Sequence, residues 1–171
     1  MLKRKKRNNM IDNLNLKELA EFLIEAKKET YANINAKEIK PQRPDFKELE
    51  YKKKFWEYRD SYCGFYFAPG QEIVRCDNVP VWAMAYSGGM YKKYHGDLNF
   101  AKDTFNFLKI VLSKVNVNQP YRGPKIYKKG KFEYVNVVKG DITDFSGTEK
   151  IYFNGKIVFK QNYVGGLIIN K

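Results

Sequence analysis

The sequence feature that most constrains the fold is a hairpin pattern near the C-terminus. Residues 149–153 and 156–160 each alternate between apolar and polar side chains, and Asn154-Gly155 separates the two runs. An Asn-Gly pair between alternating runs is typical of a type I′ turn, because both central residues of that turn need positive φ. The pattern therefore predicts two neighbouring antiparallel strands joined by a two-residue turn.

Strand-like segments also occupy much of the remaining chain, and turn residues separate several of them. The segments are 55–67, 71–76, 79–87, 132–139, 142–145 and 162–169. The expected turns are Pro69-Gly70, Asp77-Asn78, Gly88-Gly89 and Ser146-Gly147. Residues 35–54 are polar and contain two prolines, so we expect that segment to run over the surface.

Two stretches have the periodicity of amphipathic helices. The first begins near Asn13 or Asn15 and ends near residues 31–33, and the second begins at Asp97 or Asn99. Asn and Asp are residues that cap the first turn of a helix. In both stretches apolar side chains recur every three or four residues, which is typical of a helix packed on a core.

The order of these elements predicts an α+β domain, with a curved antiparallel sheet packed against two helices. A strongly curved sheet wrapped on a helix, as in cystatin-like or NTF2-like folds, is one form that suits this order. A chain of 171 residues is typical of one domain. We expect residues 1–12 to form a flexible basic arm and residues 13–171 to form a single domain.

The stretch from Phe55 to Met90 has the most varied chemistry, with both tryptophans, both cysteines and several tyrosines. On an extended strand, the even-numbered residues from 56 to 62 share one side. Aromatic side chains with a few charged groups are typical of small-molecule and peptide pockets. We expect one concave pocket to be lined by Trp56, Tyr58, Asp60, Tyr62, Glu72, Trp82, Tyr86 and His95.

Two other roles are open for the charged residues of this stretch. Carboxylates among aromatic side chains can have raised pKa values and act as acids or bases. They can equally pair with Arg59 and Arg75 in a network that fixes the sheet. The structural role and the binding of an unknown ligand are both favoured over catalysis.

No catalytic signature was found in the chain. The phosphate-binding patterns GxxxxGK[ST] and GxGxxG and the metalloprotease pattern HExxH are absent. Ser87 precedes glycines but lacks a GxSxG elbow, and a Cys63/His95 pair is better interpreted as a packed thiol and an unrelated histidine. His95 is the one histidine, which excludes a His-rich metal site, and we expect no cofactor.

The formal net charge is +13, and residues 3–7 alone supply five positive charges. Aromatic residues interleaved with lysines at 91–94 and 121–131 could stack on single-stranded bases while the lysines contact phosphates. No RNP motif and no helix-turn-helix spacing accompanies them. A solvated surface is therefore the preferred interpretation, and association with nucleic acid is an alternative.

Cysteine usage and hydropathy bear on the compartment. Cys63 and Cys76 have neither a CxxC nor a zinc-knuckle spacing, and we interpret them as free thiols of a cytosolic protein. No apolar signal region follows the basic start, and no run approaches the roughly 18 apolar residues of a membrane span. We expect a cytoplasmic protein that makes no membrane contact.

Six segments are distinctive: AKKETYA at 26–32, YRDSYCGFYFAPGQEIV at 58–74, PVWAMAYSGG at 80–89, TFNFLKIVLSKV at 104–115, PYRGP at 120–124 and GDITDFSGTEKIYFNGKIVFKQNYVGG at 140–166. Together they resemble a bacterial family of domains of unknown function, over about residues 16–168. Members occur alone or behind a helix-turn-helix of the phage-repressor type. The resemblance implies a sensing or accessory role and brings no activity, cofactor or catalytic residue. Residues 1–15 are too few for a helix-turn-helix.

The sequence therefore predicts a domain that binds a small molecule or a protein partner in an aromatic pocket without chemistry. A small enzyme that uses Asp60, Glu72 or His95 as acid or base is the first alternative. Association with nucleic acid through the basic arm and the Lys/Tyr loops is the second.

Overall fold

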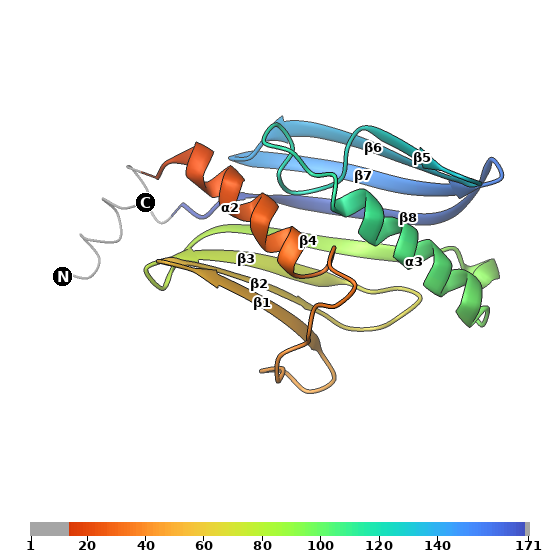
Figure 1. The fold of residues 1–171 in the computed structure, drawn as a ribbon, viewed down its shortest axis with the longest axis horizontal. Helices are drawn as coiled ribbons and strands as arrows, with labels where there is room; N and C mark the ends of the chain where they lie inside the picture. The colour runs from red at the N-terminus through yellow and green to blue at the C-terminus, as the bar shows by residue number, and fades with distance from the viewer. Residues whose placement is uncertain (1–13, 170–171) are drawn as a thin grey trace.

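The computed structural model describes residues 14–169 (Figure 1). These residues form two α-helices, α2 at Leu16–Glu29 and α3 at Leu98–Leu112, and a short 3-10 helix, η1, at Lys92–Tyr94. The expected basic arm at residues 1–12 and the alternative cap Asn13 lie outside the described residues. The strands are β1 (Lys47–Lys53), β2 (Trp56–Tyr62), β3 (Gly70–Cys76), β4 (Val79–Met90), β5 (Ile126–Lys129), β6 (Phe132–Asp141), β7 (Asp144–Phe153) and β8 (Lys156–Leu167).

The strands form one antiparallel sheet in the order β1-β2-β3-β4-β8-β7-β6-β5. The sheet is curved and open, with β1 and β5 at its edges, and both helices lie across one face of it (Figure 1). We call this face the inner face and the opposite one the outer face. The predicted α+β architecture is confirmed, while the likeness to cystatin-like or NTF2-like folds stays a prediction.

Both helices begin at the capping residues that the sequence offers. The Asn15 side chain accepts hydrogen bonds from the backbone N–H groups of Lys17 and Glu18. The Asp97 side chain accepts one from the backbone N–H of Phe100 at the start of α3. These contacts satisfy N–H groups that have no partner within the helix.

The hydrophobic core has two parts, one beneath each helix. The part beneath α2 includes Leu19, Leu23, Tyr58, Trp82 and Phe145. The part beneath α3 includes Phe107, Leu108, Tyr134, Ile151 and Phe159. Buried charged groups, described below, lie where the C-terminal end of α2 approaches α3.

The predicted hairpin is confirmed. Phe153 pairs with Lys156 across the turn, and Asn154 and Gly155 have φ of 49° and 76°. The positive φ at both positions is what a type I′ turn requires. The same geometry recurs at Asp77-Asn78, where φ is 47° and 64° and the turn joins β3 to β4.

Several predicted strand limits were wrong. β4 and β7 run through Gly88-Gly89 and Ser146-Gly147, where we expected turns, because the glycines of these pairs lie against neighbouring strands. A Cβ on Gly88 would lie 2.3 Å from the Lys160 carbonyl oxygen, and one on Gly147 would lie 2.3 Å from the Tyr163 ring. Glycine thus permits close packing inside these strands. The expected strand at 142–145 is instead a turn followed by the start of β7.

The region around β2 also differs from expectation. β2 ends at Tyr62, because Gly64 takes a φ of 90° and turns the chain away from the sheet. The polar segment 35–54, expected to cross the surface, contains the edge strand β1. Its Leu49 is buried on the inner face opposite Asp60 of β2. A strand with so many charged residues is typical of a sheet edge, where charges prevent pairing with other chains.

Candidate functional site

A cavity of about 280 Å³ lies between the inner face of the sheet and the two helices. Strands β2, β3, β4 and β8 form its floor, and its walls come from the C-terminal end of α2, from α3 and from the loop that follows β2. Figure 1 shows the end of α2 approaching α3 above these strands. The cavity therefore lies where the two parts of the core meet.

The alternation of β2 separates two groups of charged residues. Tyr58, Asp60 and Tyr62 line the cavity, as does Glu72 of the neighbouring strand β3. Tyr86 of β4 also lines it. These are five of the eight pocket residues that the sequence suggested.

The other side of β2 carries the arginine–carboxylate network that was the structural alternative. The Arg59 guanidinium lies 2.5 Å from the Glu50 carboxylate and 3.5 Å from that of Glu48. Arg75 lies 3.2 Å from Glu57 in the same way. Because side chains alternate along a strand, the arginine–carboxylate network and the residues that line the cavity lie on opposite faces of the sheet.

Asp60 is the most unusual titratable group of the cavity. Its side chain accepts a 2.6 Å hydrogen bond from the Tyr86 hydroxyl, and the residue is 2 % exposed. In the register of the sheet it lies directly opposite Glu72. Burial, together with the negative charge of Glu72, raises the pKa of Asp60 to about 7, against the opposing effects of Tyr86, Lys27 and Arg122. Asp60 can therefore take up or release a proton near neutral pH.

Glu72 already has cationic partners. Its carboxylate accepts a hydrogen bond from the Lys27 ammonium of α2, and its other oxygen lies 3.8 Å from the Arg122 guanidinium. Burial lowers the pKa of Lys27, although the charge of Glu72 counteracts this effect. These contacts tie α2 to the floor of the cavity.

Arg122 forms a second buried ion pair, with Glu149 of β7. Glu149 also accepts hydrogen bonds from the Tyr134 hydroxyl, at 2.7 Å, and from the Gln161 amide, at 3.1 Å. Burial opposes the charge on Arg122, but Glu149 more than compensates, so the pKa of Arg122 is raised. The cluster connects the loop after α3 to β6, β7 and β8. The Glu149 carboxylate accepts hydrogen bonds from three side chains.

A family model described as "Domain of unknown function (DUF5680)" matches residues 60–168, which is more than half of the chain. The chain belongs to the DUF5680 family. No curated protein and no solved structure matches it. The DUF5680 match begins at Asp60 within β2 and includes α3 and the strands β3 to β8. The matched region thus contains most of the cavity floor, whereas Lys27 and Tyr58 precede it.

Two of the predicted pocket residues are core residues in this DUF5680 chain. Trp56 stacks on Phe22 of α2, with the ring centroids 5.4 Å apart. Trp82 is fully buried, and its indole N–H donates a 3.0 Å hydrogen bond to the Ile142 carbonyl oxygen. Neither lines the cavity. The inner face of the sheet extends well beyond the cavity, and both indoles fill the part beneath α2.

His95 is also separate from the cavity. Its Nε2 lies 3.0 Å from the Met90 carbonyl oxygen, and its ring stacks on Tyr66 at 5.3 Å between centroids. Within residues 14–169, no hydrogen bond joins it to Cys63. Between these limits there is likewise no group of three or more His, Cys, Asp or Glu residues arranged to hold a metal ion. None of the described helices is long and apolar enough to cross a membrane.

Sequence reasoning missed three residues that shape the site, namely Lys27, Arg122 and Glu149. Two of them had a detectable signal. Lys27 follows Leu23 by four residues and therefore lies on the apolar stripe of α2. Glu149 precedes the buried Ile151 by two residues and shares its face of β7. Arg122 lies in a loop, where no periodicity indicates burial.

Proposed function

We propose that this DUF5680 protein binds a small organic molecule in the cavity, as a sensing or accessory domain. The observation that carries this proposal is a cavity lined by aromatic side chains with a few polar groups, which is the usual composition of a ligand site. Its volume of about 280 Å³ is slightly below the roughly 300–1,000 Å³ range of such sites. A ligand built on a single ring system fits this volume.

Small residues keep the space open. Ala32, Ala68, Gly88 and Gly89 all line the cavity. A protein interior normally fills such space with side chains, because voids forfeit packing contacts. The cavity is thus a departure from close packing, and it lies beside the buried charges. In this proposal the protein acts in the cytoplasm, which suits its free cysteines.

The test is a fragment screen monitored by two-dimensional amide NMR spectra. Fragments that bind the cavity should shift the amide signals of Tyr58, Asp60 and Tyr86. Ala32→Trp, which fills the cavity, should abolish these shifts, whereas Ala85→Trp on the exposed outer side of β4 should keep them. A screen of chemically varied fragments that shifts no cavity signal in the folded protein would overturn the proposal.

A second function, acid–base catalysis, is favoured by the placement of Asp60. A carboxyl whose pKa lies near 7, next to a second carboxylate and inside a cavity, has the properties of a general acid or base. Its test is conversion of a bound molecule. Wild-type protein and Asp60→Asn would be incubated with each fragment that binds, and the fragments analysed by mass spectrometry. Conversion by the wild type alone would support catalysis, and unchanged fragments would exclude it for those compounds.

A further inference from the structure

The inner part of the cavity carries balanced charge. Its two cations, Lys27 and Arg122, pair with the two carboxylates Glu72 and Glu149. Asp60 adds no charge in its protonated form, which its pKa of about 7 makes available at neutral pH. A ligand that enters the cavity while Asp60 is protonated therefore meets no unbalanced ion at the floor.

The aromatic faces that could attract a cationic ligand already have cations above them. The Lys27 ammonium lies 5.8 Å from the centroid of the Tyr58 ring, and the Arg122 guanidinium lies 5.8 Å from that of Tyr86. Lys109 lies 5.5 Å from the ring of Tyr31. Contacts of this length are in the range of cation–π interactions. A cationic ligand would have to compete with these groups and would be repelled by them.

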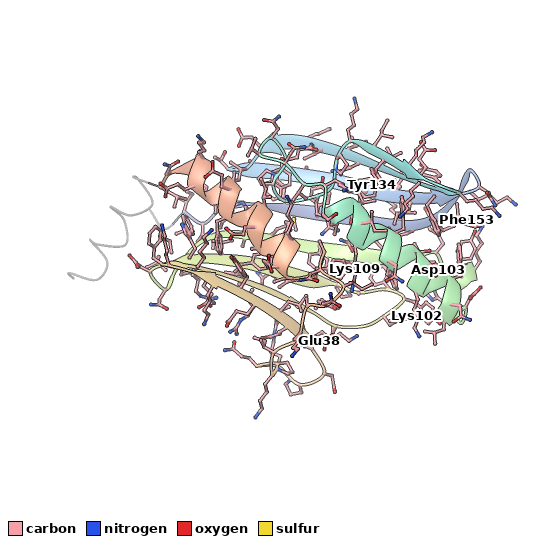
Figure 2. All side chains as sticks on the ribbon, in the orientation of Figure 1. Glu38, Lys102, Asp103, Lys109, Tyr134 and Phe153 are labelled. Carbon is pink, nitrogen blue, oxygen red and sulfur yellow. The ribbon has the colours of Figure 1, made fainter. Side chains whose placement is uncertain are left out.

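The rim of the cavity carries uncompensated positive charge. Three lysines from two elements line it, and we call Lys47 of β1 and Lys102 and Lys109 of α3 the rim lysines. Among the ion pairs found in residues 14–169, none involves a rim lysine. Glu38 is the rim carboxylate that faces them, and Figure 2 shows it on the same side of the molecule as Lys102 and Lys109. Three positive charges thus face one negative charge.

Beside the rim lysines, the wall that α3 and β8 provide is apolar. Phe105, Leu108 and Leu112 of α3 line this side together with Phe159 of β8. The cavity thus offers an apolar surface next to a cationic rim and a neutral floor. Such a combination complements a molecule with an apolar body and a negatively charged end.

We propose that the ligand is a small organic anion, whose ring or hydrocarbon body packs on α3 and whose carboxylate or phosphate contacts the rim lysines. This inference rests on the proposed function and specifies its ligand class. An exposed charge pair in the lower part of its usual range changes an affinity about two-fold, so the three lysines together should favour the anion by roughly 5- to 10-fold over a neutral analogue.

The experiment uses three probes with the same ring and different charge. Indole-3-acetate is an anion, indole-3-acetamide is neutral and tryptamine is a cation. Dissociation constants come from NMR titration of the cavity amides at low and high salt. We expect indole-3-acetate to bind about 5- to 10-fold tighter than the amide at low salt, and tryptamine to bind weakest. Phenyl phosphate, compared with phenylacetate, then distinguishes the two anionic groups.

Variants of the rim lysines test whether these residues cause the preference for the anionic probe. The double change Lys102→Gln and Lys109→Gln should remove the preference for indole-3-acetate over indole-3-acetamide, because the remaining Lys47 is balanced by Glu38. The matched control changes Lys156→Gln and Lys160→Gln on β8, which are exposed and outside the cavity, and should keep the preference.

The outcomes separate the two proposals. Equal or tighter cavity binding of the amide or of tryptamine would overturn the anion proposal and leave ligand binding supported. A preference for the anion that persists in the double variant would also overturn it. If none of the probes shifts a cavity signal, the anion proposal falls, and the broader fragment screen decides whether the proposed binding function falls with it.

Discussion

Substitution of Asp60 by Asn is the sharpest test of the buried carboxyl. Asn has nearly the shape of a protonated Asp and keeps an oxygen that can accept the Tyr86 hydrogen bond, but it cannot ionise. The pKa of Asp60 is raised from 3.8 to about 7 on folding, so the folded state holds the proton more tightly than the unfolded state. The free energy of unfolding of the wild type should therefore fall between about pH 4 and pH 7 and then level off.

The size of this effect follows from the same contacts. At about 1.4 kcal/mol per unit of pKa difference, the change from 3.8 to about 7 corresponds to roughly 4 kcal/mol. Two ionised carboxylates about 5 Å apart, as expected for directly opposed residues, repel by about 3 kcal/mol at an effective dielectric constant near 20. Burial of Asp60 is the largest cause of the raised pKa, the repulsion from Glu72 of β3 adds to it, and Tyr86 of β4, Lys27 of α2 and Arg122 offset part of the total. About 2–3 kcal/mol of the total should be lost between pH 5 and pH 8.

Urea unfolding at pH 5, 6, 7 and 8, followed by the fluorescence of the buried tryptophans, measures this dependence. The difference in unfolding free energy between Asp60→Asn and the wild type should shift by about 2–3 kcal/mol in favour of the variant across this range. Asp103→Asn, which removes an exposed carboxylate on α3 (Figure 2), is the control and should follow the wild type.

Parallel pH curves for the wild type and Asp60→Asn would refute the reasoning. They would mean that Asp60 has the same proton affinity in the folded and unfolded states. Asp60 would then be ionised in the folded protein at neutral pH, and the cavity floor would carry a net negative charge. Asp60 would then not act as a general acid or base near neutral pH, and the floor of the cavity would not be neutral.

Three further substitutions test individual contacts and one turn of the fold by urea unfolding. Arg122→Met should lower the free energy of unfolding by about 3–5 kcal/mol, because it leaves Glu149 buried without its cation, and a loss below about 1 kcal/mol would contradict this. Gly155→Ala should lower it by about 1–2 kcal/mol, because alanine must take a φ of 76°; an unchanged midpoint would argue against the strain. Trp82→Phe should cost about 1–3 kcal/mol by leaving the Ile142 carbonyl unpaired, yet fragment binding should not change.

Local chemistry in the sequence was sufficient to predict much of the fold. The turn at Asn154-Gly155 and the cap at Asp97 were predictable because each depends on residues a few positions apart. Gly88-Gly89 and Ser146-Gly147, which lie inside β4 and β7, were wrongly predicted to be turns. Whether a glycine turns the chain or admits a neighbour depends on what lies across the sheet, which local sequence does not contain. The charged edge strand β1 was not predicted for a similar reason, because its pairing with β2 is a contact that local sequence does not contain.

The candidate site was predictable to a different degree. Alternation along β2 grouped Tyr58, Asp60 and Tyr62 correctly, because the side-chain period of a strand is fixed at two. The same logic included Trp56 and could not exclude it, since period alone does not say where along a strand the cavity begins. Arg122 lies in a loop, where buried side chains have no regular spacing that sequence could reveal.

β2 carries charged residues on both faces of the sheet, and this arrangement disfavours incorrect strand pairing during folding. If β2 paired with its neighbours after sliding by one residue, every side chain would change faces. Arg59 would then enter the space beside Lys27 and Arg122, and Asp60 would leave it for the opposite side. The move of Arg59 to the inner face would bury an unmatched charge, at a cost of several kcal/mol. The charged residues of β2 thus favour the correct register of this strand in the sheet, whichever ligand binds in the cavity.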